Sequence, residues 1–431
     1  MCHVIELTQS ALREILREAK NVYIQGGAST PTYLLDMIGE MDIGGLSFYH
    51  IELGGDVFLF REDHTDRFRD YSFFVGANAR DALQKGWTRY IPIFLSDIPW
   101  FLRTQIRLDL AIVNVSTPDS KGMMSLGPTV EAAKVAVEVA RRTIAQVNGE
   151  VPRTFGGDSL ITPGMVSHFL RHDEPPLHVT KRERPDEVDM KIGRNVAELI
   201  PDGATVQAGI GKVPDAVMLS LSDRRDLGVH TELISDGIVE LMERGVVNNR
   251  LKAIDRYHTV GTFAKGERKV FDYLDDNTSV QMRSVEYTND TSVIRRNRMM
   301  HSINSAVEVD LTGGAGVRRV HRAQGHIRGG RWPDGLCPWI VTFRGREINN
   351  SPEVHDQGRE VEDRPVPDAG DWSYYDKKPR SVRGYRVRCC RTEGQDHSGK
   401  GHRDGFGGTP PQVQVRAGGG GIQDPQGLTS R

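Results

Sequence analysis

The feature that most constrains the fold is an alternation of strand-like and helix-like segments up to about residue 313. Residues 11–19 have the pattern of a helix, and residues 21–25 that of a short buried strand, which a glycine-rich turn joins to another helix. Residues 89–95 and 108–115 are apolar strands, and residues 129–147 have apolar side chains at helical spacing. This alternation predicts an α/β domain with a mainly parallel sheet, covering residues 1–180.

A second alternation predicts a second, similar α/β domain over residues 190–313. Residues 172–190 are charged and contain three prolines, which is typical of a linker. Helices are expected at 192–200, 213–221 and 238–244, and strands at 204–208 and 229–234. Residues 314–431 differ, because they are rich in Arg, Gly, Pro and Asp and lack sustained apolar periodicity. Three interpretations of this irregular tail are disorder, an Arg/Gly-rich RNA-binding segment, and the reading-frame change described below.

Composition excludes several classes of protein. A formal net charge of -2 gives no global signal for nucleic acid or for an acidic membrane surface. The N-terminus lacks the pattern of a secretory signal, and no apolar run approaches the length of a membrane span. Four cysteines in 431 residues are too few for a disulfide scaffold, and the adjacent Cys389 and Cys390 lack zinc-ligand spacing. We therefore expect a reducing, cytoplasmic setting.

Two loops at predicted strand ends are candidate ligand sites. Gly209 and Gly211 separate a strand from a helix that Pro214 opens, and such a loop lets an anion approach free backbone N–H groups. A plain tight turn explains the same residues, and the motif lacks the third glycine of a dinucleotide fingerprint. Ser116 lies in a second loop, whose Pro-Asp and Lys-Gly pairs are also ordinary turn chemistry.

Glu232 lies on the strand predicted over residues 229–234, which leads into Ser235, Asp236 and Gly237. A carboxylate at the carboxyl end of a strand in an α/β domain is well placed for a cleft. The competing interpretation is a solvated or ion-paired acid. His168, His172, His178 and His258 are interpreted as structural or surface residues, and no metal site, Walker loop or nucleophile elbow is expected.

Taken together and in order, several segments resemble the acetyl-CoA hydrolase/transferase family, which includes 4-hydroxybutyrate, butyrate and acetate CoA-transferases. The resemblance covers residues 20 to 313. The segments that carry it are 26–31, 74–80 with Asn78, 90–96, 115–119, 125–127, 145–148, 152–154, 209–217, 231–237, 287–290 and 302–313. Two departures from the family pattern leave local acyl or CoA contacts open. Gly156 and Gly157 both precede Asp158, where the family usually has a single glycine, and Ser120-Lys121-Gly122 stands in the loop where the family often has His-Gly.

The resemblance implies ping-pong CoA transfer between an acyl-CoA and a small carboxylate, such as acetate, butyrate or 4-hydroxybutyrate, with Glu232 as nucleophile. It also implies CoA or substrate contacts at Gly209, Gly211, Pro214, Asn78, Ser116, Asp236 and Gly237. Coenzyme A is then a substrate, with no separate cofactor, and a homodimer is a possible assembly. Hydrolysis of acetyl-CoA through the same glutamate is an alternative. An alternative of another class is a non-enzymatic protein whose tail contacts RNA.

The resemblance also predicts a glycine-rich Gly-Gly-Gln-(Met or Val)-Asp-Phe segment and a Thr-Glu-Tyr-Gly segment after residue 313, and neither is present. A frame shifted by one base permits the first from residues 331–339 and the second from residues 382–402. Trp332 followed by Pro333 forces a glycine codon in that frame. We therefore predict a frameshift near Gly313, an incomplete second domain, and a chain that is unstable and largely inactive as written.

Overall fold

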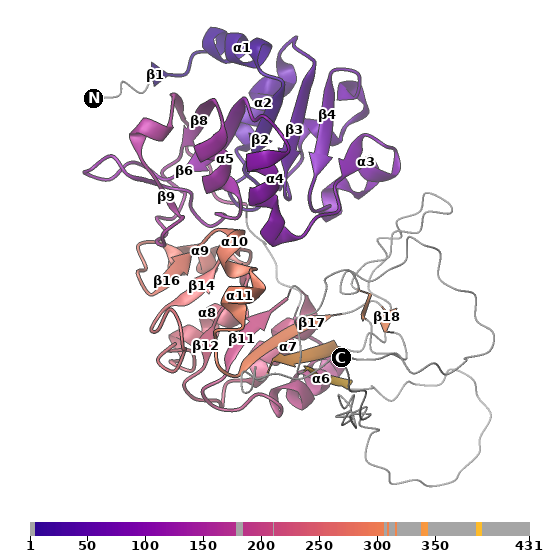
Figure 1. Ribbon diagram of the computed structural model, residues 1–431, viewed down its shortest axis with the longest axis vertical. Helices are drawn as coiled ribbons and strands as arrows, with labels where there is room; N and C mark the ends of the chain where they lie inside the picture. The colour runs from indigo at the N-terminus through magenta and orange to yellow at the C-terminus, as the bar shows by residue number, and fades with distance from the viewer. Residues whose placement is uncertain are drawn as a thin grey trace, which may run out of the picture.

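The computed structural model describes residues 5–177, 184–209 and 211–305, together with four short strands between residues 308 and 389. Two α/β domains follow each other along the chain and lie one above the other in Figure 1. The linker predicted over residues 172–190 begins directly after strand β10, but its last four residues, 187–190, form the start of helix α6, and its residues 178–183 lie outside the described residues.

The first domain is built on an eight-stranded sheet in the order β1-β10-β8-β6-β2-β3-β4-β5. All of its neighbouring strands are paired in parallel, as the alternation predicted. Its helices are α1 (Gln9–Glu18), α2 (Thr32–Glu40), α3 (Arg80–Gln84), α4 (Ile98–Thr104) and α5 (Ala133–Val139). Its strands are β1 (Ile5–Glu6), β2 (Asn21–Ile24), β3 (Leu46–His50), β4 (Phe68–Ser72), β5 (Thr88–Tyr90), β6 (Leu110–Val115), β7 (Met124–Ser125), β8 (Arg142–Val147), β9 (Leu160–Ile161) and β10 (His168–Arg171). Short 3-10 helices are η1 (Phe58–Phe60), η2 (Glu62–His64), η3 (Ala77–Ala79), η4 (Leu95–Asp97) and η5 (Pro163–Met165).

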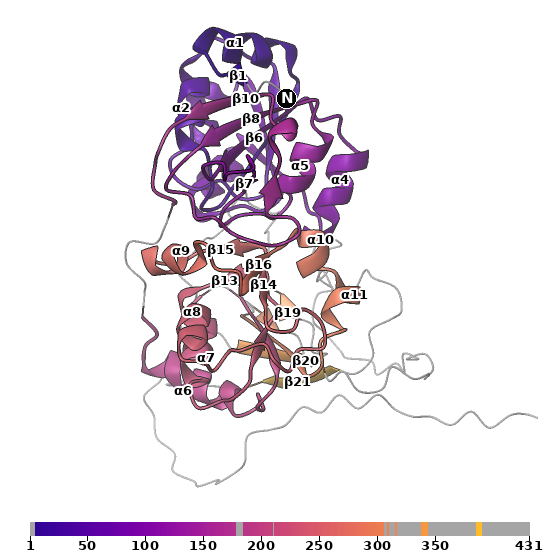
Figure 2. The same ribbon diagram turned by 90° about the vertical axis from the view of Figure 1, so that its left-hand side faces the viewer.

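Helices cover both faces of this sheet, with α1 and α2 on one side and α4 and α5 on the other (Figure 2). Strand β6 illustrates the consequence, because all six of its residues are buried. Leu110 and Ile112 pack with α1 and α2, whereas Ala111 and Val113 belong to the cluster with α4 and α5. Successive side chains of a strand point to opposite faces, so a doubly covered strand is an unbroken apolar run.

The second domain carries its strands in several small sheets. Strand β11 pairs in parallel with β12 and β17, β13 pairs with β15, and β14 pairs with β16. Its helices are α6 (Glu187–Ala197), α7 (Lys212–Ser220), α8 (Asp236–Glu243), α9 (Arg268–Leu274), α10 (Val285–Thr288) and α11 (Thr291–Ile294). Its strands are β11 (Thr205–Ala208), β12 (Gly228–Val229), β13 (Leu233–Ile234), β14 (Thr259–Gly261), β15 (Phe263–Ala264), β16 (Val280–Met282) and β17 (Met300–Ser305).

Four further strands lie at or beyond the expected end of this domain: β18 (Glu308–Val309), β19 (Ala315–Gly316), β20 (Pro338–Phe343) and β21 (Tyr385–Cys389). Strand β20 pairs antiparallel with β17, and β21 pairs antiparallel with β20, so segments of the region expected to be irregular extend the second domain's sheet. Other residues of the tail lie outside the described residues. Among the residues that the structure describes, no helix is long and apolar enough to cross a membrane.

Three expectations about individual elements were wrong in part. Residues 129–147 form the helix α5 and then the strand β8, because Ala140 adopts an extended conformation and ends the helix. Of the strand expected over 89–95, only residues 89 and 90 belong to a strand, β5, and the chain then enters η4. The strand expected over 229–234 is divided into β12 and β13, and this division places Glu232 between two strands.

Candidate active site

Backbone hydrogen bonds join the two domains through the segment between β14 and β15. The N–H groups of Val130 and Glu131 donate to the carbonyl oxygen of Thr262, at 2.9 and 3.3 Å. The N–H of Val285 donates to the carbonyl oxygen of Glu131 at 3.1 Å, and that of Ala264 donates to Pro128 at 2.8 Å. Bonds in both directions fix the position of one domain against the other at this point.

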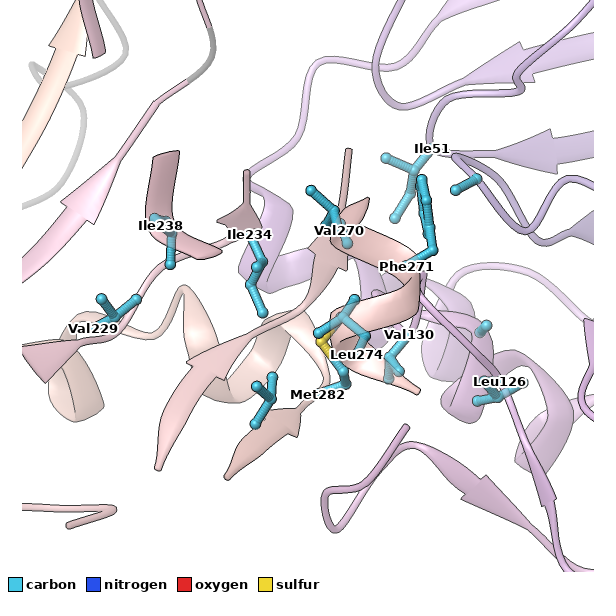
Figure 3. Packing of buried hydrophobic residues seen from close by; sticks show 14 of the residues in the cluster. Ile51, Leu126, Val130, Val229, Ile234, Ile238, Val270, Phe271, Leu274 and Met282 are labelled. Atoms are coloured by element: carbon cyan, nitrogen blue, oxygen red, sulfur yellow. The ribbon is translucent and has the colours of Figure 1, made fainter. Parts of the chain in front are cut away.

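Apolar side chains from both domains belong to one buried cluster at this contact. In Figure 3, Phe271 and Leu274 of α9 and Met282 of β16 lie against Ile51 and Val130 of the first domain. Each of these side chains is at most 3% exposed. The contact is therefore a packed, water-poor environment for any charged group placed beside it.

Glu232 lies directly beside this interdomain contact. Its carbonyl oxygen accepts hydrogen bonds from the N–H groups of Thr262 and Phe263, both at 3.0 Å. Its side-chain Oε2 accepts a 2.8 Å bond from Nδ2 of Asn289. The structure describes no hydrogen-bond partner for the second oxygen, Oε1, among the residues that it includes. One oxygen of the carboxylate is thus oriented, and the other is available to react.

The surroundings of Glu232 raise the pKa of its carboxyl group above the ordinary value, because burial disfavours the charged form. The hydrogen bond from Asn289 acts in the opposite direction and favours the carboxylate. The residue as a whole is of intermediate exposure. A carboxylate that has lost part of its hydration is a better nucleophile than a fully hydrated one.

Asn289 and Glu131 were not among the predicted site residues. Asn289 lies in the segment 287–290, which carried part of the resemblance, so its motif was the available signal. Glu131 precedes α5, inside a stretch that was interpreted as one long helix. Its φ of 39° and its contact with Thr262 depend on tertiary structure and leave no pattern in the sequence.

Asn78 is placed near the interdomain contact, where it supports a loop. Its Nδ2 donates to the carbonyl oxygens of Leu53 and Gly55, at 3.0 and 2.8 Å. The same loop contains Glu52, whose Oε1 lies 3.6 Å from Nζ of Lys265 in the second domain. Asn78 thus holds one side of an ion pair between the domains, and its predicted CoA contact stays a prediction.

Asp236 and Gly237 form the first turn of α8, immediately after β13. Oδ1 of Asp236 accepts a 3.1 Å hydrogen bond from the N–H of Glu267. In the same segment, the N–H of Lys265 donates to Ile234. The segment 262–267 therefore connects Glu232, the start of α8 and the Glu52 loop.

Gly209 and Gly211 flank the end of β11, as expected, and Pro214 lies buried in the first turn of α7. A Cβ atom at Gly209 would lie 2.8 Å from Oδ1 of Asn304, so a larger residue does not fit there without movement. Gly211 has a φ of 126°, which favours glycine, and faces open space. The adjoining residue 210 lies outside the described residues, and the ligand interpretation of this loop stays a prediction.

Ser116 is buried and follows directly after β6, and its hydroxyl group forms hydrogen bonds within the loop that leads to β7. Its Oγ accepts a 2.9 Å bond from the N–H of Ser125 and donates to the carbonyl oxygen of Thr117 at 3.2 Å. No described contact joins Ser116 to Glu232. Of the histidines, His172 stacks on Tyr33 with ring centroids 3.8 Å apart, and His178 lies outside the described residues.

Comparison with known proteins relates both domains of this chain to one protein family. The model of the acetyl-CoA hydrolase/transferase N-terminal domain matches residues 7–180, and that of the C-terminal domain matches residues 266–332. The second match therefore continues past the junction predicted near residue 313 and ends well before residue 431.

Named relatives agree with these matches. A succinyl-CoA:acetate/propanoyl-CoA:succinate CoA transferase of Fasciola hepatica is 41% identical over 69% of this chain and 63% of its own length. A 4-hydroxybutyrate coenzyme A transferase of Clostridium kluyveri is 40% identical over 62% of each chain. The chain thus spans less than two thirds of the length of these relatives.

A solved structure supports the same assignment. The crystal structure of RipA from Yersinia pestis is similar with a TM-score of 0.67 and 31% identity, covering 72% of this chain and 78% of that one. The two matched domains, the relatives and this fold agree, and the chain belongs to the acetyl-CoA hydrolase/transferase family.

Proposed function

We propose that this chain derives from a CoA-transferase that moves coenzyme A between an acyl-CoA and a small carboxylate, with Glu232 as the nucleophile. The observation that carries the proposal is the carboxylate at the interdomain contact, with Oε2 held by Asn289 at 2.8 Å and Oε1 without a described partner. Both relatives reported above are named as CoA transferases. Acetate, butyrate and 4-hydroxybutyrate are the proposed class of carboxylates.

In the proposed reaction, Oε1 of Glu232 attacks the thioester carbonyl carbon and the carbon–sulfur bond breaks. CoA thiolate is released, and an acyl-glutamyl anhydride forms. The thiolate then attacks the glutamyl carbonyl carbon, which releases the carboxylate product and forms a glutamyl-CoA thioester. An incoming carboxylate attacks the carbonyl carbon of that thioester, which expels CoA thiolate and forms a new acyl-glutamyl anhydride. The thiolate then attacks the acyl carbonyl carbon of this anhydride, which forms the new acyl-CoA and releases the carboxylate of Glu232. This sequence retains the thioester bond energy only while water is excluded, as the apolar cluster at the contact favours.

Each attack creates an oxyanion that needs hydrogen-bond donors. We assign this role to the backbone N–H groups of Asp236 and Gly237 in the first turn of α8, close in sequence to Glu232. Gly209, Gly211 and Pro214 are proposed to lie against CoA, because Gly211 adopts a positive φ and faces open space at the start of α7. Asn78 and Ser116 are the remaining residues of the proposed substrate site, and their hydrogen bonds hold the loops in which they lie.

Trapping the intermediate tests the function. The chain as written and the chain restored to the shifted frame are both incubated with acetyl-CoA and then with borohydride. Glu232 is expected to be modified, to a greater extent in the restored chain, as detected by peptide mass spectrometry, and Glu240 of α8 serves as the internal control. Measuring CoA release with and without acetate separates transfer from the alternative, hydrolysis, because hydrolysis needs no acceptor. Labelling of other acidic residues with Glu232 untouched would count against the proposal.

The frameshift near Gly313 is part of this proposal and has its own test. Resequencing the gene across this point is expected to find the shifted frame open, and stop codons in that frame would exclude the idea. The chain restored to that frame should have higher transfer activity than the chain as written. The RNA-binding alternative predicts instead a salt-dependent RNA affinity that is lost on deleting residues 314–431.

The cytoplasmic setting and the homodimer also belong to the proposal. The low cysteine content supports the first, and cell fractionation tests it. Sedimentation of the purified chain tests the second.

A further inference from the structure

Glu131 is a second acidic residue at the contact between the domains, and the chain holds it there through its backbone. Its N–H donates to Thr262 and its carbonyl oxygen accepts from Val285, so both of its peptide groups bind the other domain. Its φ of 39° lies in the left-handed region, which costs free energy for a residue other than glycine. A strained residue fixed from both sides is characteristic of a functional position.

The side chain of Glu131 is 5% exposed, and its Oε2 has no hydrogen-bond partner among the described residues. The ionisable groups whose charges reach it are Glu232 and Glu52, and Tyr23 is in turn influenced by Glu131. Lys265 is paired with Glu52. The charges that act on Glu131 are therefore those of two other acids, and the described part of the chain shows no ion pair between Glu131 and a cation.

This setting opposes ionisation. Burial, Glu52 and Glu232, in decreasing order of effect, raise the pKa of Glu131 to about 8. At neutral pH the group is then a carboxylic acid, which donates a hydrogen bond, whereas a carboxylate only accepts. A buried acid kept neutral by its surroundings can bind an anionic partner that a carboxylate would repel.

We propose that Glu131 is a positioning residue for the chemistry of Glu232. Glu131 presents an un-ionised carboxyl group, and not a second negative charge, to the reacting carboxylate of Glu232. This inference rests on the proposed function of Glu232. The two residues are linked through Thr262, whose carbonyl binds the N–H of Glu131 and whose N–H binds the carbonyl of Glu232. The species that pass through the site are anionic: the carboxylate substrate, CoA thiolate and each tetrahedral adduct.

Ionisation of Glu131 therefore raises the energy of every anionic species beside Glu232 and slows its acylation. We measure the rate at which Glu232 of the full chain becomes modified, with borohydride as the trap. This rate is expected to fall about tenfold as the pH rises from about 7 to 9, because a charge interaction that is equivalent to one pKa unit changes a rate about tenfold. Glu131→Gln, which keeps a neutral hydrogen-bond donor, should remove this alkaline decrease. Glu131→Ala should remove it too, but with a lower rate at every pH.

Glu286→Gln is the matched control, because Glu286 is an exposed acid at the same interdomain contact, where it pairs with Arg103. It should keep the alkaline decrease of the parent chain. Persistence of the decrease in Glu131→Gln would overturn the proposal.

Infrared spectroscopy tests the charge of Glu131 without any activity. The difference spectrum between the full chain and Glu131→Gln should contain the C=O stretch of a protonated carboxyl group at pH 7, and that band should disappear with a midpoint near 8. Glu232→Gln should move this midpoint to lower pH, whereas Glu286→Gln should leave it in place. A missing band at pH 7, or a midpoint that Glu232→Gln does not move, refutes the role of Glu131. Failure to label Glu232 both in the parent chain and in the chain restored to the shifted frame counts instead against the transferase function.

Discussion

Two buried acids lie in contrasting regions of this molecule. Asp70 is inside the first domain on β4, where its Oδ1 lies 2.9 Å from Nε2 of His50 on the neighbouring strand β3. Glu131 is at the contact between the domains, where no cation balances it among the described residues. Both are at most 5% exposed, so burial alone does not distinguish them.

The difference lies in what each acid is given as a partner. Asp70 has a hydrogen-bond partner, His50, inside its own domain, which reduces the penalty of burying its polar side chain. The acid at the contact is placed near Glu232 and Glu52, which increases that penalty. Functional sites are where proteins accept such destabilising arrangements, so the unpaired acid indicates the site.

Replacing Glu232 by Gln has the largest expected effect, because an amide then stands in place of the proposed nucleophilic carboxylate. CoA release from acetyl-CoA should fall by about 10⁴-fold or more, as is usual when a nucleophile is removed. Stopped assays with excess acetate measure this loss. A variant that retains more than a tenth of the parent rate would exclude Glu232 as the nucleophile.

Breaking the structural pair should have the next largest effect. Asp70→Ala leaves His50 buried without its partner, and we expect the free energy of unfolding to fall by about 3–5 kcal/mol. Urea unfolding followed by circular dichroism measures this change. Asp70→Asn, which can still accept a hydrogen bond, should lose less, and equal losses in both variants would contradict the contribution of the charge.

Glu131→Gln should change stability in the opposite direction. The folded-state pKa of about 8 lies above that of an unfolded glutamate, so the native chain binds the extra proton between these values and its stability falls as pH rises through this window. Removing the acid should therefore raise the free energy of unfolding by on the order of 3 kcal/mol at pH 7. The gain should be absent near pH 4 and constant above pH 9. A pH-independent gain would show that burial of the charge is not its cause.

Asn289→Ala removes the hydrogen bond that orients Oε2 of Glu232. The pKa of Glu232 should rise further, because this bond favours the carboxylate. We expect the rate of Glu232 acylation to fall by about 10- to 100-fold, the worth of one hydrogen bond to a charged group. The loss should shrink as pH increases, and a loss that is equal at all pH values would leave orientation as the only role of Asn289.

The contrast between the two regions also separates what the sequence can predict from what it cannot. The first domain was predicted well, because doubly covered parallel strands such as β2 and β6 are local apolar runs. The segment from 129 to 147 was misinterpreted, because its apolar residues fit a helix and a buried strand equally well.

The proposed site could be predicted only where a motif carried it. Glu232 was proposed from the ordered motifs and not from any local pattern, and its role stays a prediction. Glu131 and Glu52 were not proposed, because they lie about 100 and 180 residues before Glu232 in the chain and reach its surroundings only when the two domains come together. Such proximity has no periodicity that one sequence displays.

Glu286→Gln should have the smallest effect of all and completes the comparison. Arg103 and Glu286 form a bidentate ion pair between the domains, at 2.6 and 3.0 Å, but their side chains are 39% and 41% exposed. Water and salt weaken an exposed pair, so we expect its removal to lower the free energy of unfolding by less than about 1 kcal/mol, with a smaller effect at high salt. Urea unfolding at low and high salt measures both. A loss as large as that of Asp70→Ala would mean that charge pairs at the domain contact matter as much as those in the core, and the unpaired state of Glu131 would then lose its significance.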